Sequence, residues 1–550
     1  MANLVPDGGI GYGGGMNDSA AATAFRPDEC AMAINFRVGP DTTLEVLGGS
    51  QRTHAAALNS GAQSWGATAF READGTQHMV RFVGDTMYDS TDNGATWTSP
   101  TGATGLVEAY WSFATIADVG GTVYLCCANG DSDAYKYDGS TWSALTDGPA
   151  GPKYLATFNS RLYASDGRVL YASDIRDPDT FTAPPGIVVP VQTHDGDDIT
   201  GLFVAGPVLL VFKRNSTAYS SGFGNLDIVV QTGAVGVSRS VGCMAPRSVC
   251  GVADAAVAWL SEQGVALYSG GAIQILTNTK LRSFMRSISW DAIAADPGIP
   301  TGMYDAGRQE YTCGVPVGGT QNNYDIIVNM ATRGPTLGRR FSPSGYTLIL
   351  DADGYLDVVA SNAESLVRLS DGYVDLAAGW QLGAYADIDA DGYLDFATAS
   401  YDPAAYFTAD VGGTPNALFA DGYDGFLRRL EDADQDDTLV DGSGGTPLAA
   451  LMIDRPRHVK AAMEPKQARK VEVMATSDTP ASLTLSVRGD GVEGAQHAVS
   501  LPAGSSGRPQ WTHTHVNVRG RTLETIVRSS TARLRIAGIR MWAQILQRRS

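Results

Sequence analysis

Short apolar stretches, broken by Gly, Asp and Asn, follow one another from about residue 65 to residue 333 at intervals of roughly 8 to 12 residues. They group into units of roughly 30 to 50 residues, the length of a propeller blade. The apolar run at 208–213 predicts a strand buried on both faces. Residues 280–295 have apolar positions at helical spacing, and Pro297 follows them. We therefore expect an all-β chain with a β-propeller of about six blades and one helical stretch.

Two turn motifs favour the propeller. Residues 90–97 read S-T-D-N-G-A-T-W, which matches the Asp-box pattern S-x-D-x-G-x-T-W. In this pattern the Asp carboxylate accepts hydrogen bonds from backbone amides, Gly takes a positive φ, and Trp packs between strands. Residues 135–142 end a related hairpin with Trp142. These residues stabilise a turn, so the motif indicates a fold and does not indicate catalysis.

The sequence changes character after Gly345. The tripeptide Asp-Gly-Tyr begins at residues 353, 371, 391 and 421, and it predicts hairpin turns in an acidic inserted β region. From Pro447 onward, four segments alternate apolar and polar residues, as the strands of a β-sandwich do.

These patterns predict four parts of the chain. Residues 1–64 are an N-terminal arm, in which Gly-rich residues 8–15 are flexible, and a first strand that leads into the propeller. Residues 65–345 form the β-propeller body. Residues 346–446 hold the acidic DGY-rich insertion and the closing blade. Residues 447–550 form a C-terminal basic β-sandwich.

Charge is distributed unevenly along the chain. The 40 Lys and Arg against 59 Asp and Glu give a formal charge of −19. Residues 447–550 hold 16 Lys and Arg against 7 Asp and Glu, a net +9, so residues 1–446 carry −28. Within that part, residues 351–437 hold 19 acidic and 3 basic residues, a net −16. An acidic chain does not grip nucleic acid over its whole surface, but it can let DNA pass without binding it.

Cysteine usage and hydropathy exclude several classes of protein. The six cysteines form no CxxC pair, so we expect buried thiols in a reducing compartment and neither disulfides nor a zinc site. No apolar run approaches the roughly 18 to 20 residues of a membrane helix, and the N-terminus has no signal pattern. We expect no membrane anchor.

One acidic motif has the spacing of a calcium loop. Asp387, Asp389, Asp391 and Asp395 stand at positions 1, 3, 5 and 9 around a Gly turn, an arrangement that places carboxylate oxygens around Ca²⁺. The alternative is a solvated acidic turn, because two sister copies have an apolar residue in the position of Asp387. We expect no cofactor, and a calcium ion at these four carboxylates is the one candidate that the sequence offers.

No motif indicates an enzyme. The Asp box suggests a sialidase, but sialidases need an arginine triad, a Tyr/Glu pair and usually several boxes, whereas the box occurs cleanly once here. GxSxG, Walker A and HExxH motifs do not occur. His513 and His515 alternate beside Trp511, which predicts a half-exposed strand face more than a metal pair. The alternative that remains is a calcium-dependent glycan-binding or sialidase-like propeller.

The order of several segments resembles the tail nozzle proteins of short-tailed bacteriophages, a group that overlaps tubular tail protein B and packaged-DNA stabilisation proteins. The segments are residues 27–36 with 44–49, 161–181, 198–202 with 209–213, 258–265, 304–311 and 425–430. Two features depart from the family pattern. The DGY-rich stretch at 351–410 is longer and more acidic, and the turn after the last blade reads Asp436-Asp437-Thr438 instead of Asp-Asp-Gly.

The resemblance implies a structural virion protein with no enzymatic activity. Such proteins form a ring, usually a hexamer, below the portal and its tail adaptor protein, near tail fibres or tail spikes. The ring extends and closes the DNA channel, retains the packaged genome and lets genomic DNA pass without sequence recognition. The expected location is the phage tail in the virion, after synthesis in the host cytoplasm. We further expect part of the acidic segment 351–437 to face the channel or its rim, and the basic domain to dock on an acidic neighbour.

Overall fold

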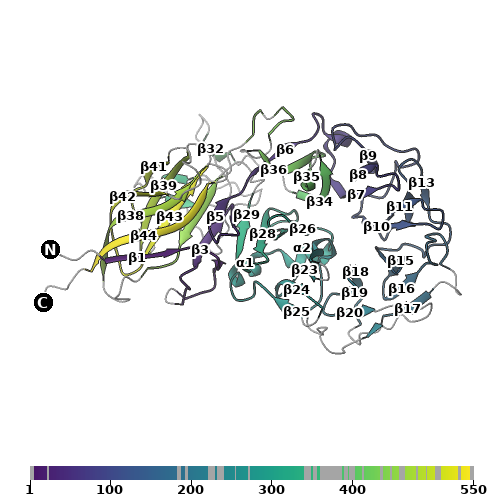
Figure 1. Cartoon of the computed structure of the whole chain (residues 1–550), viewed down its shortest axis with the longest axis horizontal. Helices are drawn as coiled ribbons and strands as arrows, with labels where there is room; N and C mark the ends of the chain where they lie inside the picture. Colours follow the sequence, from purple (N-terminus) through teal and green to yellow (C-terminus); the bar gives the residue numbers. More distant parts are fainter. Residues whose placement is uncertain are drawn as a thin grey trace.

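Figure 1 shows the computed structural model of the chain, a ring of small sheets with a sandwich at one side. The structure describes residues 5–21, 24–181, 187–191, 196–220, 230–231, 241–253, 256–270, 273–339, 348–350, 356–358, 387–388, 394–395, 403–411, 414–433, 438–441, 443–445, 449–457, 465–477, 481–490, 492–501, 510–530 and 534–545.

Seven antiparallel sheets of the described residues form the ring. The first six, in chain order, are β7 (Ser64–Arg71) to β9 (Thr86–Ser90), β10 (Ser112–Ala117) to β13 (Trp142–Ala144), β14 (Tyr154–Phe158) to β17 (Ile187–Pro190), β18 (Ile199–Ala205) to β21 (Val230–Gln231), β22 (Cys250–Ala253) to β25 (Ile273–Ile275), and β26 (Thr301–Asp305) to β29 (Pro335–Gly338). The strands between these are β8 (Gln77–Val83), β11 (Val123–Ala128), β12 (Tyr135–Tyr137), β15 (Arg161–Asp166), β16 (Val169–Ala172), β19 (Val208–Lys213), β20 (Thr217–Ser220), β23 (Ala256–Ser261), β24 (Gly264–Tyr268), β27 (Glu310–Val315) and β28 (Tyr324–Asn329).

The seventh sheet closes the ring with strands from distant parts of the chain. Its order is β34 (Pro403–Val411), β35 (Thr414–Gly422), β36 (Leu427–Ala433) and β6 (Gly49–Arg52). The innermost strand β34 contacts both β7 of the first blade and β26 of the sixth. The predicted all-β propeller is thus confirmed. Six sheets come from the predicted body, and a seventh joins the N-terminal segment to residues 403–433.

The Asp box forms the predicted turn. The Asp92 carboxylate accepts a hydrogen bond from the Thr96 amide (2.9 Å), and Gly94 has a φ of +84°. The Trp97 indole nitrogen donates to the Gly94 carbonyl (2.9 Å). Trp97 packs against Met79 of the first blade and buried residues of the closing blade. The motif therefore stabilises the seam where the ring closes.

Two sheets of the sandwich lie beside the ring (Figure 1). One has the order β4 (Phe36–Val38), β5 (Leu44–Val46), β44 (Arg535–Ile545), β38 (Lys466–Thr476) and β42 (Gln510–Gly520), and β1 (Val5–Ile10) also pairs with β44. The other continues from the sixth blade through β3 (Glu29–Ile34), β37 (Ala450–Asp454), β43 (Leu523–Ser529), β39 (Ala481–Gly489) and β40 (Val492–Glu493). In the same sheet β2 (Gly15–Met16) pairs with β3, and β41 (His497–Leu501) pairs with β39.

The sixth blade and one of the two sheets of the sandwich are parts of one 11-stranded sheet. Their junction is a parallel bridge between Leu337 of β29 and Ile34 of β3. One buried hydrophobic cluster extends from Leu485 in the sandwich to Tyr311 in the sixth blade and Leu260 in the fifth. Because they share a core, the sandwich and this side of the ring stabilise each other.

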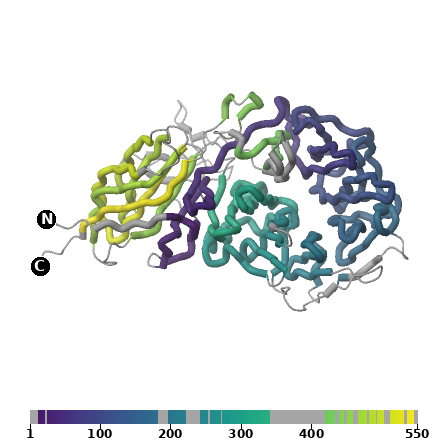
Figure 2. Tube along the Cα trace, in the orientation of Figure 1, coloured from purple at the N-terminus to yellow at the C-terminus, as the bar shows by residue number. Residues whose placement is uncertain are grey.

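The N-terminal segment differs from the flexible arm expected at residues 8–15. Residues Val5–Ile10 form β1, which pairs with β44 from Ala543 to Gly538, and Tyr12 is buried in the shared core. Figure 1 shows β1 running along β44, the last strand of the chain, and Figure 2 shows the trace of the sandwich beside the ring in the same orientation. The Gly-rich composition suggested a flexible linker, but here glycine allows two backbone segments to lie close together. A Cβ on Gly15 would lie 2.5 Å from the Pro335 carbonyl oxygen.

The helical stretch at 280–295 is divided into two short helices, α1 (Arg282–Ser287) and α2 (Trp290–Ala295). The predicted apolar positions Leu281, Met285 and Ile293 are buried. The helix breaks at Ile288, which has extended dihedral angles and forms a β-bridge with Val317. No helix among the described residues is long and apolar enough to cross a membrane.

Candidate functional site

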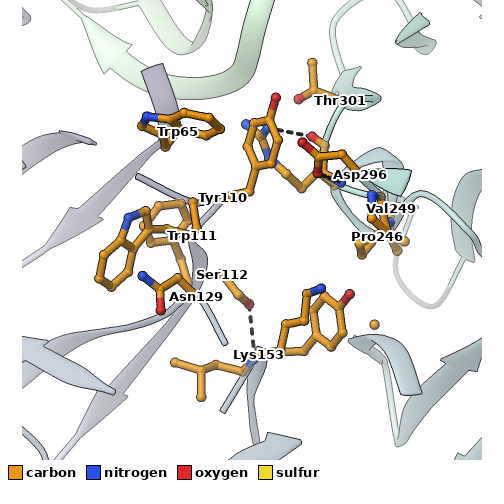
Figure 3. A pocket seen from close by; sticks show the side chains of 18 of the residues that line it. Trp65, Tyr110, Trp111, Ser112, Asn129, Lys153, Pro246, Val249, Asp296 and Thr301 are labelled. Atoms are coloured by element: carbon orange, nitrogen blue, oxygen red, sulfur yellow. Dashed lines mark hydrogen bonds between the residues drawn. The ribbon is translucent and has the colours of Figure 1, made fainter. Parts of the chain in front are cut away.

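A cavity of about 520 Å³ lies where the inner parts of six blades meet (Figure 3). It is lined by β7, β10, β14, β18 and β26, by the 3₁₀ turn η2 (Pro246–Ser248), and by the loop that follows α2. Its walls are rich in aromatic side chains, namely Trp65, Tyr110, Trp111, Phe113, Tyr154 and Phe203. The volume and lining are those of a small-molecule site, and no single blade could form them.

Tyr110 is held in place from three sides. Its ring meets the Trp65 ring edge-on with centroids 5.1 Å apart, and its hydroxyl accepts a hydrogen bond from the Gln63 amide (3.2 Å). The Arg247 guanidinium lies 4.5 Å from the ring centroid, within the range of a cation–π contact. A Cβ on Gly298 would lie 2.0 Å from the ring, so only glycine fits against it. Burial raises the pKa of Tyr110, which keeps its hydroxyl neutral.

Arg247 brings a positive charge to the cavity wall. It donates a hydrogen bond to the Gly298 carbonyl (2.8 Å), and in the described part of the chain it has no ion-pair partner. Burial lowers its pKa, although Tyr110 and Asp296 act in the opposite direction. Figure 3 places Asp296 on the same side of the cavity as Val249 and Pro246, while Trp111 and Asn129 lie on the opposite side. Among the described residues, the lining includes neither His nor Cys.

Two of the four predicted calcium ligands lie outside the described residues. Asp387 belongs to β32 (Asp387–Ile388) and Asp395 to β33 (Leu394–Asp395), and the two are directly paired across this antiparallel ladder. Asp389 and Asp391 lie outside the described residues. Within the described ranges, no group of three or more His, Cys, Asp or Glu side chains is placed to hold a metal ion. Between residue 346 and the closing blade, which begins at β34, the other described strands are β30 (Leu348–Leu350) and β31 (Leu356–Val358), and these pair with each other.

The fourth DGY copy has a role that its sequence did not suggest. Asp421, at the end of β35, is fully buried and forms an ion pair with Arg81 of β8, whose Nε donates at 3.1 Å. The Ser64 hydroxyl also donates to Asp421. His54 Nε2 lies 3.1 Å from Arg81 and accepts a hydrogen bond from the Leu427 amide. This copy therefore joins the closing blade to the first blade.

The outer face of the sandwich carries the basic charge predicted for the C-terminal domain. Arg469, Arg519 and Arg521 are exposed at one end of β38 and β42, and none has an ion-pair partner among the described residues. In the same sheet, the Arg540 guanidinium of β44 lies 4.3 Å from the ring centroid of Trp511 in β42 and forms an ion pair with Glu472 of β38 (3.5 Å). The three unpaired arginines give this end of the sheet a positive charge that is suited to an acidic partner.

His513 and His515 lie on this face as the alternation predicts. Both are exposed on β42, and their ring centroids are 5.8 Å apart. Five of the six cysteines are buried and Cys250 is half-buried; all are free thiols, and burial raises the pKa of Cys126 to about 12. These thiols are therefore protonated and unreactive at neutral pH.

Sequence reasoning missed both the cavity and the buried ion pair. The cavity residues are separated by up to 237 positions, from Trp65 to Gly302, so no local motif connects them. The ion pair did leave a signal. Arg81 is the one charged residue in the stretch M-V-R-F-V of β8, which is otherwise apolar, and a charged residue at a buried strand position needs a counter-charge.

Comparison with known proteins does not assign a family. No protein-family model matches the chain, and no curated protein matches it either. Among solved structures, the extracellular domain of a hybrid two-component system from B. thetaiotaomicron is similar over 74% of this chain, with 10% identity and a TM-score of 0.32. The chain spans 57% of that domain. The N-terminal domain of Nup159 is similar over 73% of this chain and 99% of its own length, with 9% identity and a TM-score of 0.37.

Proposed function

We propose that this protein is a structural subunit of the tail nozzle of a short-tailed bacteriophage. Copies of the chain form a ring, a hexamer by analogy with the family it resembles, below the portal and its adaptor. The ring retains the packaged genome and lets it pass during ejection. The protein performs no catalysis in this role.

The observation that carries the proposal is the arrangement of charge on the fold. The basic C-terminal segment, net +9, is joined through a continuous sheet to the propeller, and residues 1–446, which contain the propeller and the acidic insertion, carry −28. A subunit with an acidic body and a basic side module can bind the next copy head to tail, which is how closed rings are built. The order of family-like segments along the sequence supports the same function.

The subunit's own axis is unsuited to DNA. The cavity that the structure describes on this axis has a volume of about 520 Å³, that of a small-molecule site, and aromatic side chains line its walls. In the proposed assembly the channel therefore runs between subunits. Acidic residues of 351–437 that face this channel repel the DNA phosphates, so the genome slides without binding. The basic face contacts the adaptor or the acidic segment of a neighbouring copy.

Cryo-electron microscopy of purified phage particles tests the proposal. We expect seven-bladed densities in a ring on the tail axis, below the adaptor, with the sandwich of one copy against an acidic surface of its neighbour. Particles that lack the protein should lose their DNA or their tails. A ring-free location, such as the tip of a fibre, would contradict the proposal.

A further inference from the structure

Two side chains of opposite charge, Arg247 and Asp296, lie on the wall of the central cavity. Both are half-buried, and in the described part of the chain neither forms an ion pair, with the other or with a third residue. A charge that is withdrawn from water is normally paired. Two unpaired charges of opposite sign on one cavity therefore indicate a ligand that supplies both counter-charges.

A single residue, Gly298, holds both groups in place. Its amide donates to Asp296 Oδ1 (3.1 Å), and its carbonyl accepts a hydrogen bond from Arg247 Nη1 (2.8 Å). The same glycine packs against the Tyr110 ring, and Figure 3 shows Asp296 beside Tyr110. Because the two anchors are the amide and the carbonyl of one residue, the carboxylate and the guanidinium are fixed relative to each other.

The remaining polar atoms of the two groups are free and accessible. In the described structure, Nη1 makes the one hydrogen bond of the Arg247 guanidinium, and Oδ1 makes the one hydrogen bond of the Asp296 carboxylate. Arg247 Nε and Nη2 and Asp296 Oδ2 are not among the enclosed polar atoms that lack a partner, so they keep accessible surface. Nε and Nη2 form the edge of a guanidinium that can donate two parallel hydrogen bonds to a carboxylate.

The charges around the cavity favour a ligand that carries both signs. Lys153 and Arg247 supply two positive charges, and Glu108, Asp131 and Asp296 supply three negative ones. A simple anion would meet the carboxylates, and a simple cation would meet the two basic groups. Lys153, Glu108 and Asp131 are exposed, so water and salt screen them, whereas the half-buried Arg247 and Asp296 are screened less.

We propose that this cavity binds a free α-amino acid with an apolar side chain. The ligand carboxylate accepts hydrogen bonds from Nε and Nη2 of Arg247, and the ligand ammonium donates to Asp296 Oδ2. The side chain packs on the aromatic walls, which include Trp65, Trp111 and Phe203. An α-amino acid carries both charged groups on one carbon atom, which suits two groups anchored on one residue. The volume of about 520 Å³ is that of a small-molecule site.

This inference does not depend on the nozzle proposal. The site is formed by six blades of one subunit, so it exists in the isolated chain whether or not copies assemble into a ring. Loss of amino-acid binding would leave the ring unaffected, and absence of a ring would leave amino-acid binding unaffected.

Titration calorimetry of the full-length protein with L-phenylalanine and two analogues tests the site. The analogue 3-phenylpropionate lacks the ammonium group, and 2-phenylethylamine lacks the carboxylate. We expect saturable binding of phenylalanine, and binding of each analogue at least about tenfold weaker, because each loses one charge-assisted contact. The tripeptide phenylalanyl-glycyl-glycine distinguishes a free amino acid from the end of a peptide. Its carboxylate is two residues away from its ammonium, so it should also bind at least about tenfold more weakly.

Two variants assign the contacts to the two side chains. Asp296→Asn keeps the oxygen that accepts the Gly298 amide and removes the negative charge. We expect about a tenfold loss of affinity for phenylalanine and phenylethylamine and no loss for phenylpropionate. Arg247→Gln should show the reverse, with about a tenfold loss for phenylalanine and phenylpropionate and no loss for phenylethylamine. A change that merely distorted the cavity would weaken all three ligands alike.

Asp305→Asn is the matched control. Asp305 is half-buried, and its Oδ1 accepts the Gly307 amide (2.8 Å) in the same type of turn, but it does not line the cavity. This variant should bind phenylalanine within about twofold of the original protein.

Three results would overturn the site. One is the absence of saturable phenylalanine binding at tens of millimolar. The second is an equal loss of affinity for all three ligands in Asp296→Asn and Arg247→Gln when both variants are folded by circular dichroism. The third is binding of the tripeptide as tight as that of phenylalanine or tighter, which would identify a peptide site.

Discussion

Two regions of the molecule use arginine and carboxylate side chains in opposite ways. At the closing seam, formed by Arg81, Asp421, Ser64 and His54, the charges are fully enclosed and paired. On the outer face of the sandwich, Arg469, Arg519 and Arg521 are exposed and have no ion-pair partner among the described residues. A buried charge that loses its partner destabilises a fold strongly, whereas an exposed charge contributes little to stability and remains available for partners. The seam therefore holds the fold together, and the face is suited to association.

Removing one partner of the buried pair should produce the largest effect. In Asp421→Ala the Arg81 guanidinium, which has no exposed surface, stays buried without its counter-charge. We expect the free energy of unfolding to fall by about 3 to 5 kcal/mol. Urea denaturation followed by circular dichroism measures this loss.

Two controls separate burial from charge. Arg168 and Asp198 form an exposed ion pair at 3.0 Å in the same propeller, and Asp198→Ala should cost about 0.5 kcal/mol or less. The double variant Arg81→Met with Asp421→Ala should be more stable than Asp421→Ala alone, because it leaves no unpaired buried charge. An equal fall in the free energy of unfolding for Asp421→Ala and Asp198→Ala would show that the buried pair contributes no more to stability than an exposed one.

The seam also marks the limit of what the sequence could predict. The Asp box, the buried thiols and the alternating strands of the sandwich are local patterns, and the structure contains them. Pairing of β6 with β36 joins residues almost 380 positions apart, as Arg52 and Arg428 show, and only tertiary packing decides it. Nothing in the sequence distinguished Asp421 from the other three DGY copies, because its burial beside Arg81 follows from the packing of the first blade against the closing blade. The axial cavity likewise follows from the closure of the ring.

Substitution of His78, which lies between the first and second blades, should lower the free energy of unfolding by an intermediate amount that depends on pH. His78 Nδ1 lies 2.9 Å from Asp89, and its Nε2 lies 2.5 Å from Glu72, beside the rings of Phe70 and Tyr137. Burial lowers the pKa of His78, but the hydrogen bonds and charges of Asp89 and Glu72 outweigh burial and raise it. The charged imidazolium can donate to both carboxylates at once.

Because the folded pKa is raised, the stability from His78 is fully present below the unfolded value, about 6.5, and is lost as the pH rises through the folded value. We expect His78→Gln to cost about 1 to 2 kcal/mol at pH 6 and less at pH 9. Urea denaturation of both proteins at the two pH values measures the difference.

His54 provides the matched control for this pH dependence. Burial, followed by the charge of Arg81, lowers the pKa of His54 to about 4, so its ring is neutral at both pH values. The loss of stability in His54→Gln should therefore be the same at pH 6 and pH 9. A similar change with pH in both variants would show that the effect arises elsewhere in the chain.

Reversing the exposed charges should have the smallest effect on stability and a large effect on association. In the triple variant of Arg469→Glu, Arg519→Glu and Arg521→Glu, no ion pair of the described structure is broken, so the free energy of unfolding should change by about 0.5 kcal/mol or less. Because the net charge of residues 447–550 falls from +9 to +3, attraction to an acidic neighbour weakens and incorporation into particles should fall.

Deleting residues 447–550 is a poorer test than substitution, since it removes the strands that pair with β1, β3 and β5. Immunoblotting of purified particles, with Arg168→Glu in the propeller as a single-charge control, measures incorporation. A triple variant that is stable and fully incorporated would show that this face is not the docking surface.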